Sequence, residues 1–269
     1  MDRRMLPVLK MLCLDFDGTV LVYDHPEGVF PPTVIECLNG LARRSVRWCT
    51  NSGRDLPSQT EVLERSCDAG LQHMPAAILC SETMIFPADG RHYRPWEAWN
   101  RRAGLLLRRF HARAQETLRP FLEDWQRRYQ PRSIVHAQAT VFQVENKDGL
   151  PERLLAEVRA ATQNLPGSIV TQNGGWVAVL PEDLGKGNVL RAYLHHAGLS
   201  PDVTLAIGDH VNDLSMLDGL AATRLGCPSD AAPAVRESVA RAGGRIASAP
   251  GPEGTVEIIQ YYLDQEGKR

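Results

Sequence analysis

Short apolar runs bounded by turn residues recur along the chain, and segments with helical spacing of apolar positions lie between them. Runs of this kind are typical of parallel strands that are covered on both faces of a sheet. Pro31-Pro32 and Leu56-Pro57 place proline at helix starts, where its missing N–H is tolerated. The pattern predicts a parallel sheet with helical crossovers. Its first part comprises strands at 9–14, 46–49 and 76–80 and helices at 33–44 and 56–69.

The chain changes character at about Phe86, where arginine-rich, tryptophan-bearing helical sequence begins. We expect an α+β unit over 86–182, inserted between two parts of one domain at 1–85 and 183–269. The elements expected in this unit are helices at 95–129 and 151–163, a strand at 140–145, and a hairpin over 168–180 that turns at Asn173-Gly174-Gly175.

The alternating pattern resumes after the inserted segment. Leu184-Gly185-Lys186-Gly187 begins a helix that we expect to end at His196, and 203–207 is again a continuous apolar strand. The fold class predicted is therefore α/β, with a three-layer parallel-sheet domain and an inserted α+β unit. The elements expected in the last part are helices at 215–220, 231–242 and 255–263 and strands at 221–225 and 245–247.

Composition agrees with a globular protein, because 43% of the 269 residues are hydrophobic and 23% are charged. No apolar run approaches the roughly 20 residues that a membrane span needs. The apolar segment after Met1-Asp2-Arg3-Arg4 is too short for a signal peptide, so we expect a cytoplasmic protein. The six cysteines form no CxxC pair, which favours small buried side chains over disulfides or zinc ligands.

The net charge of −2 hides an uneven distribution. Eleven arginines and four acids give the segment 91–132 a net charge of +7. Its arginines either form solvated helix faces around a tryptophan-containing core, or recruit a substrate with a second anionic group. A nucleic-acid partner is disfavoured because the whole chain is slightly acidic and contains no recognisable binding motif.

Polar clusters follow three of the expected strands, and a lysine begins a helix between the second and third. Because the carboxyl ends of parallel strands share one edge of a sheet, these side chains are expected to converge. Carboxylate oxygens suit Mg²⁺, while a threonine, backbone amides and a lysine can neutralise a phosphate. The clusters are Asp15 and Asp17, then Thr50 and Asn51, then Asp209, Asn212 and Asp213; the lysine is Lys186.

These residues occur in motifs that resemble those of the haloacid dehalogenase-like (HAD) superfamily of phosphotransferases. Asp15-Phe16-Asp17-Gly18-Thr19 is similar to its first motif, DxDGT, and Thr50-Asn51-Ser52-Gly53-Arg54 to its second. Lys186 stands at the position of the third motif's lysine, and Gly208-Asp209-His210-Val211-Asn212-Asp213 matches the fourth, GDxxND. The resemblance implies a Rossmann-like core with a cap domain.

The position of the insertion indicates the branch of the superfamily. Between Asp17 and Thr50 there is room for one loop and one helix, whereas about a hundred surplus residues separate Thr50 from Lys186. The insertion resembles the type C2B cap of the Cof-like, sucrose-phosphate phosphatase, mannosyl-phosphoglycerate phosphatase and phosphomannomutase groups. Ser81-Glu82-Thr83-Met84-Ile85 is also similar to a GTEI-like segment of the sucrose-phosphatase-like branch.

The resemblance implies roles for individual residues. Asp15 would be the nucleophile that forms an aspartyl-phosphate, and Asp17 would be the general acid and base. Mg²⁺ would be held by the Asp15 carboxylate, the Asp17 main-chain oxygen and Asp209, with Asp213 either a direct or an indirect partner. Thr50 and Lys186 would hold the phosphate. Substrate contacts are expected from Asn51 and Asn212, and Arg54 is either a further contact or a solvated residue.

The function expected from these motifs is that of a Mg²⁺-dependent phosphatase for a small phosphorylated metabolite, most plausibly a sugar phosphate or phosphorylated sugar acid. Two alternatives stay open. A phosphomannomutase-like phosphomutase would share the first chemical step, and a non-catalytic module would use the same scaffold for binding. The sequence indicates no oligomeric state.

Overall fold

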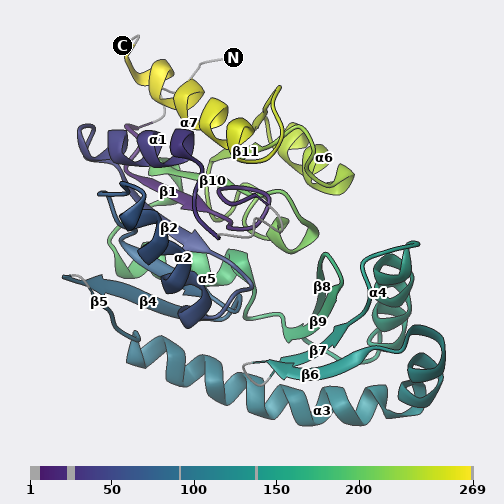
Figure 1. Ribbon diagram of the computed structural model, residues 1–269. Helices are drawn as coiled ribbons and strands as arrows, with labels where there is room; N and C mark the ends of the chain where they lie inside the picture. Colours follow the sequence, from purple (N-terminus) through teal and green to yellow (C-terminus); the bar gives the residue numbers. More distant parts are fainter. Residues whose placement is uncertain (1–6, 23–27, 91, 137–138, 268–269) are drawn as a thin grey trace. The chain divides into compact units, whose positions relative to one another are not determined.

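The computed structural model describes residues 7–22, 28–90, 92–136 and 139–267 and divides into two compact units (Figure 1). The first unit comprises the described residues up to Trp96, together with 186–209 and those from 213 onward. The second comprises 97–185 and 210–212. The inserted unit thus begins at Glu97, whereas the sequence pattern places the change at residue 86, and it ends at Gly185 rather than at 182.

The described strands of the first unit form an eight-stranded sheet in the order β12-β11-β10-β1-β2-β3-β4-β5 (Figure 1). From β12 to β3 every neighbouring pair is parallel, while β4 is antiparallel to both β3 and β5. This confirms the predicted α/β class. The strands are β1 (Met11–Leu14), β2 (Arg47–Asn51), β3 (Ala77–Cys80), β4 (Met84–Asp89), β5 (His92–Tyr93), β10 (Thr204–Ile207), β11 (Arg224–Cys227) and β12 (Arg245–Ile246).

The central strands are buried on both faces, which explains their unbroken apolar sequence. Leu12 and Leu14 belong to a core cluster with side chains of α1, α2 and α7. Met11 and Cys13 alternate with them and are also fully buried, so the opposite face of the sheet is covered as well. The helices of this unit are α1 (Pro32–Ala42), α2 (Leu56–Asp68), α5 (Lys186–His196), α6 (Pro233–Arg241) and α7 (Gly251–Gly267), with 3₁₀ turns at Pro201–Val203 and Val211–Asp213.

The helix predicted at 215–220 is wrong, because this segment is a series of turns. The Asp218 carboxylate accepts the N–H of Leu220 at 2.8 Å, and Gly219 adopts a φ of +86°, which a helix cannot continue through. The strand predicted at 221–225 instead spans Arg224–Cys227. Gly226 lets this strand pack closely against α7, because a Cβ at this position would lie 2.5 Å from the side chain of Ile258.

The sequence pattern also missed β4 and β5. Pro87 lies in β4, where it has no backbone N–H to donate, and a proline within a segment argues against predicting a strand there. The strand nevertheless pairs with β3, and the Ala88 N–H donates to Ala76 at 3.0 Å. These strands extend the first unit past residue 85. Part of the connection expected between Asp17 and Thr50, and the N-terminal Met1–Arg4, lie outside the described residues.

The described residues of the second unit form a four-stranded antiparallel sheet and two helices (Figure 1). Phe110, Leu118 and Trp125 of the long helix α3 form a core cluster with Leu154 of α4 and Val177 of β9. The strand β6 was not predicted. The elements are α3 (Glu97–Tyr129), β6 (Arg132–His136), β7 (Ala139–Gln143), α4 (Leu150–Ala161), β8 (Ser168–Asn173) and β9 (Trp176–Pro181), and the sheet order is β6-β7-β9-β8.

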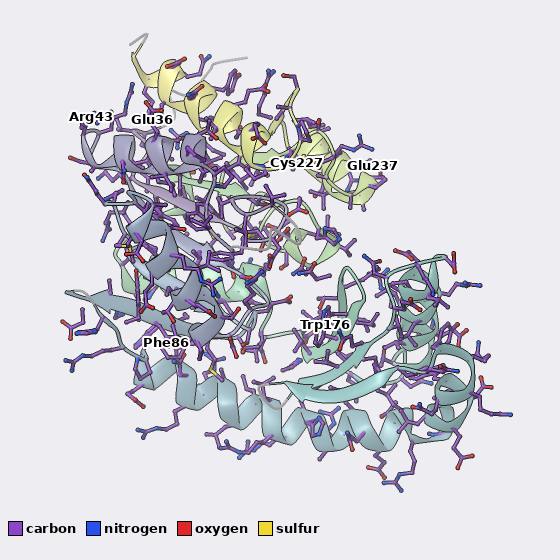
Figure 2. The ribbon with its side chains drawn as sticks, viewed as in Figure 1. Glu36, Arg43, Phe86, Trp176, Cys227 and Glu237 are labelled. Atoms are coloured by element: carbon purple, nitrogen blue, oxygen red, sulfur yellow. The ribbon has the colours of Figure 1, made fainter. Side chains whose placement is uncertain are left out.

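The arginines of α3 are exposed, and nitrogen-tipped side chains project from this helix (Figure 2). They form the solvated face opposite a buried stripe that includes Ala103, Leu107 and Ala114. No helix among the described residues is long and apolar enough to cross a membrane. All six cysteines are free; four are buried as predicted, whereas Cys37 is only partly buried and Cys67 is exposed.

Candidate functional site

The sheet brings the first and third predicted polar clusters together. Leu14 of β1 is in register with Thr50 of β2 on one side and with Ile207 of β10 on the other. Asp15 therefore follows the central strand, and Gly208 and Asp209 follow its neighbour. Asp15, Asp209 and Asp213 each offer a carboxylate oxygen, and these atoms all lie within 4.8 Å of one another.

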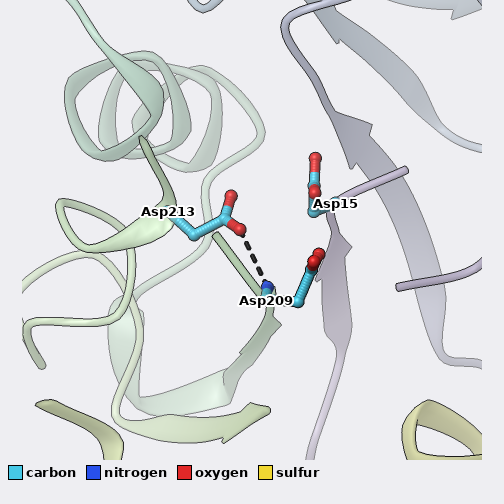
Figure 3. Close-up of side chains that lie close together, drawn as sticks. All are labelled: Asp15, Asp209 and Asp213. Carbon is cyan, nitrogen blue, oxygen red and sulfur yellow. Dashed lines mark hydrogen bonds between the residues drawn. The ribbon is translucent and has the colours of Figure 1, made fainter. Parts of the chain in front are cut away.

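The three carboxylates of this acidic cluster are buried and held in fixed orientations (Figure 3). Asp213 Oδ2 accepts the backbone N–H of Asp209 at 2.9 Å. The hydroxyl of Thr19 donates to Asp209 Oδ1, also at 2.9 Å. A Cβ on Gly208 would lie 2.5 Å from Cγ of Asp213, so a glycine is required for the Asp213 side chain to approach the backbone this closely. The cluster is thus pre-organised by its own neighbours.

Lys186 lies against this cluster and is completely buried. Its Nζ donates to Asp15 Oδ1 and to Asp213 Oδ1, each at 2.5 Å. Burial alone would lower the pKa of Lys186, but the charges of Asp15, Asp213 and Glu82 more than reverse this, and the pKa is raised. Burial raises the pKa of Asp15, and Asp213 raises it further against the opposing effect of Lys186. One ammonium does not balance three carboxylates.

This excess of buried negative charge fits a divalent cation. Buried carboxylates close to one another repel unless a cation or protons neutralise them. Hard oxygen donors are the ligands that Mg²⁺ prefers, and it usually takes only a few from the protein. Asp15, Asp209 and Asp213 could therefore hold a metal ion, although Asp213 already accepts hydrogen bonds at both oxygens. The carboxylate of Asp17 is not a member of this cluster.

Asp17 is instead paired with Arg54, which sequence analysis assigned to substrate or to solvent. Arg54 Nε donates to Asp17 Oδ2 at 2.7 Å and Nη2 donates to Oδ1 at 2.6 Å. The guanidinium carbon also lies 5.6 Å from the centroid of the Phe16 ring. Arg54 is 33% exposed and Asp17 is 17% exposed, so both side chains reach the surface of the first unit.

Thr50 and Asn51 end β2, and their side chains are fully buried. Within the described part of the chain, Thr50 Oγ1 and Asn51 Oδ1 have no hydrogen-bond partner. Asn51 Nδ2 donates to the main-chain oxygen of Lys186 at 3.0 Å, which ties β2 to the first residue of α5. Buried polar atoms without partners are costly, so these two are candidates for contact with a ligand. Asn212 is buried in the turn Val211–Asp213, and its substrate role stays a prediction.

Two residues of this region were not assigned roles by sequence analysis. Thr19 was named only as the last residue of the first motif, yet its hydroxyl donates to Asp209 Oδ1. Glu82 follows β3, the strand next to β2, and its side chain is buried. The rule that polar residues after parallel strands share one edge would have included Glu82, because β3 belongs to the same parallel set.

Comparisons with known proteins agree with this architecture. The family model of haloacid dehalogenase-like hydrolases matches residues 110–223. A phosphoglycolate phosphatase from Aeropyrum pernix is 30% identical over 143 residues, 53% of each chain, so the match spans about half the length of that relative.

Solved structures extend the likeness to nearly the whole chain. The sucrose-phosphatase from Synechocystis sp. PCC6803, solved with sucrose and phosphate, has a TM-score of 0.66 and 18% identity over 96% of this chain and 99% of its own. A haloacid dehalogenase-like hydrolase from B. subtilis has a TM-score of 0.62 and 14% identity over 94% of this chain and 99% of its own. Similarity at these identities establishes a shared fold for both units.

Proposed function

The chain belongs to the haloacid dehalogenase-like superfamily, and from this premise we propose that it is a Mg²⁺-dependent phosphatase of small phosphorylated metabolites. The observation that carries the proposal is the buried cluster of Asp15, Asp209 and Asp213 with Lys186 among them. Such a site combines a nucleophile, a place for a cation and a fixed positive charge.

The first chemical step uses Asp15 as the nucleophile. One oxygen of its carboxylate attacks phosphorus, and the bond from phosphorus to the substrate's alcohol oxygen breaks. Asp17 supplies the proton that the departing alkoxide needs. The two hydrogen bonds from Arg54 fix the orientation of the Asp17 carboxylate, and one Asp17 oxygen must exchange its hydrogen bond from Arg54 for the proton that it donates. The products of the step are the free alcohol and a phosphorylated Asp15.

The second step releases phosphate and restores Asp15. Asp17 takes a proton from water, and the water oxygen attacks phosphorus while the bond to the Asp15 oxygen breaks. Lys186 and the Thr50 hydroxyl would hold phosphate oxygens, and the buried, unpartnered Thr50 Oγ1 supports this assignment. A bound Mg²⁺ would supply positive charge at the phosphate, held by Asp15, Asp209, the Asp17 main-chain oxygen and, directly or indirectly, Asp213.

The substrate class proposed is a sugar phosphate or a phosphorylated sugar acid. Two named relatives support it, since one is a sucrose-phosphatase and another is a phosphoglycolate phosphatase. Asn51 and Asn212 are proposed to contact the substrate. Arg54 is proposed to act on Asp17 rather than on the substrate, because its Nε and Nη2 both donate to the Asp17 carboxylate.

A phosphate-release assay tests this function. Purified protein is incubated with sugar phosphates, phosphorylated sugar acids and nucleotides, with Mg²⁺ and with EDTA in its place. We expect Mg²⁺-dependent release from at least one of the first two classes, and loss of turnover by at least about a thousandfold in Asp15→Asn. Circular dichroism shows whether that variant is folded. Undiminished turnover by a folded Asp15→Asn protein would contradict the proposed chemistry.

A further inference from the structure

Arg54 is held in place by contacts at both its main chain and its side chain. Its main-chain N–H donates to Ser52 Oγ at 3.2 Å, and its main-chain oxygen accepts the N–H of Ser81 at 2.9 Å. At the guanidinium, Nη1 donates to Ser58 Oγ at 3.3 Å, while Nε and Nη2 bind Asp17. The residue that orients the Asp17 carboxylate is therefore oriented in turn by its neighbours.

Gln59 holds the same residue from inside the first unit. Its side chain is fully buried, on the face of α2 that also carries Val62 and Leu63. Nε2 donates to the main-chain oxygen of Arg54 at 3.1 Å and to that of Leu79, in β3, at 3.3 Å. Since both acceptors are carbonyl oxygens, only the NH₂ group of the amide can face them. Gln59 therefore joins the loop after β2 to the neighbouring strand.

The two hydrogen bonds from Gln59 are not needed to satisfy the main chain. The oxygen of Arg54 already accepts the N–H of Ser81. That of Leu79 already accepts the N–H of Ser52 at 3.0 Å. In the described ranges of the chain, Gln59 Oε1 has no hydrogen-bond partner, and such a buried atom is costly. Because stability alone would favour an apolar side chain here, the glutamine points to a role in holding the loop.

Proton transfer requires that Arg54 have anchors other than Asp17. One oxygen of Asp17 exchanges its hydrogen bond from Arg54 for the proton that it donates, so the clamp is weakened at this moment. Ser58 and Gln59 bind Arg54 independently of Asp17. Adjacent residues of a helix point about 100° apart, which lets the first turn of α2 reach the guanidinium with one side chain and the main chain with the other.

We propose that Ser58 and Gln59 are positioning residues that keep Arg54 against Asp17 while the proton is transferred. The inference rests on the proposed function in one respect, namely that Asp17 gives its proton to the leaving group. Small displacements of a group near the reacting atoms can remove much of its catalytic effect. A loosened Arg54 would therefore impair the chemistry even in a well-folded protein.

Two substrates with different leaving groups test this role. One is p-nitrophenyl phosphate, whose nitrophenolate leaves without a proton, and the other is the sugar phosphate that the wild type hydrolyses fastest. We expect Ser58→Ala and Gln59→Met each to lower kcat for the sugar phosphate about fivefold, the effect of one lost hydrogen bond, and to change kcat for p-nitrophenyl phosphate much less. Equal losses on both substrates, or wild-type values on both, would overturn the proposal. Ser58 is partly exposed, so its variant decides if Gln59→Met does not fold.

Matched variants separate positioning from a loss of stability. Thr60→Ala removes a hydroxyl from the same turn of α2, where it donates to two main-chain oxygens of that turn. Thr204→Val, at the start of β10, removes a buried residue's hydrogen bond to the main-chain oxygen of Ser200. Both variants should leave the ratio of the two kcat values unchanged. A ratio that falls as far in these controls would overturn the positioning role, because it would follow stability alone.

Combination with Arg54→Lys shows whether Gln59 acts through Arg54. Lysine does not form the two-pronged clamp, so loosening residue 54 further should have little effect. We expect kcat of the double variant Gln59→Met/Arg54→Lys for the sugar phosphate to equal that of Arg54→Lys alone. Fully multiplicative losses would mean that Gln59 acts by another route, and would overturn the proposal.

A measurement without substrate separates this inference from the proposed function. The ¹H–¹⁵N NMR signal of Arg54 Nε is identified as the one that Arg54→Lys lacks, and the exchange of its hydrogen with water is followed. We expect about fivefold faster exchange in Ser58→Ala and Gln59→Met and an unchanged rate in Thr60→Ala. Unchanged exchange in both of the first two variants would overturn the positioning role. If the wild type hydrolyses no phosphomonoester, the proposed function fails, and exchange still decides whether the two residues hold Arg54.

Discussion

The guanidinium of Arg54 clamps the carboxylate of Asp17 with two hydrogen bonds of 2.7 and 2.6 Å. Both residues follow parallel strands of the same sheet, β2 and β1, so this pair connects the first two motifs directly. The fork geometry of arginine matches a carboxylate, and lysine offers only a point charge in its place. Arg54 therefore determines the orientation of the group that is proposed to move the proton.

Replacing Arg54 with lysine is expected to impair proton transfer to the leaving group. Turnover of a sugar phosphate should fall about 10-fold, because the alkoxide needs a proton from a well-oriented Asp17. Turnover of p-nitrophenyl phosphate should fall less, since nitrophenolate leaves without one. Steady-state kinetics with both substrates measure the difference. Arg43→Lys, at an exposed position after α1 (Figure 2), is the control; an equal loss on both substrates would contradict this role for Arg54.

Removing the Thr19 hydroxyl is expected to weaken metal binding. Thr19 holds Asp209 Oδ1 at 2.9 Å, and groups that orient a metal ligand commonly contribute about 10- to 100-fold in affinity. We expect Thr19→Val to raise the Kd for Mg²⁺ about 10-fold in isothermal titration calorimetry. Thr19→Ser keeps the hydroxyl and should bind nearly as the wild type does. A wild-type Kd in folded Thr19→Val would show that Asp209 needs no such support.

Adding a methyl group at Gly187 is expected to separate the two halves of the acidic site. A Cβ there would lie 2.0 Å from the main-chain oxygen of Ser215, two residues after Asp213. Gly187→Ala should therefore lower the free energy of unfolding by about 2–3 kcal/mol and reduce turnover. Urea unfolding and phosphate release measure the two effects. In α1, Gly40→Ala would meet only the flexible end of Arg43 at 3.5 Å, and it should not lower stability.

Glu157 is expected to contribute to stability only above acidic pH. Hydrogen bonds from Arg128, and to a lesser extent from Tyr129 and Trp125, lower the pKa of Glu157 from 4.5 to about 2. Burial opposes this shift but does not outweigh it. Because the folded-state pKa is the lower one, this contribution is complete above about pH 4.5 and disappears as the pH falls toward 2. Its side chain is 35% exposed, and solvent screening limits the contribution to about 1 kcal/mol.

Urea unfolding of Glu157→Gln at several pH values checks this expectation. The variant should be less stable than the wild type at pH 7, and the difference should shrink as the pH falls through this window. Glu123→Gln, at an exposed position on the same helix as Arg128, is the matched control and should leave the pH dependence unchanged. A constant difference between wild type and Glu157→Gln at all pH values would mean that packing, not charge, accounts for the effect.

The sequence by itself determined the parallel sheet and the edge at which the polar residues gather. Burial on both faces forces continuous apolar strands, and a parallel arrangement brings their carboxyl ends together; Asp15, Thr50 and Asp209 follow from these two constraints. The strand β4, which contains a proline, was missed because it depends on pairing with β3. The strand β11, which contains Gly226, was misplaced because it depends on close contact with α7.

Only the tertiary structure decided which charges pair. Asp17 and Arg54 are 37 positions apart in the chain, and Asp15 and Lys186 are 171 apart, so no local pattern specifies these pairs. The role of Asp17 was inferred from its motif, but its partner depends on how the loop after β2 folds back. Glu82 shows the same limit, since a glutamate in a turn is ordinarily solvated. Its burial arises from long-range packing, which sequence spacing does not encode.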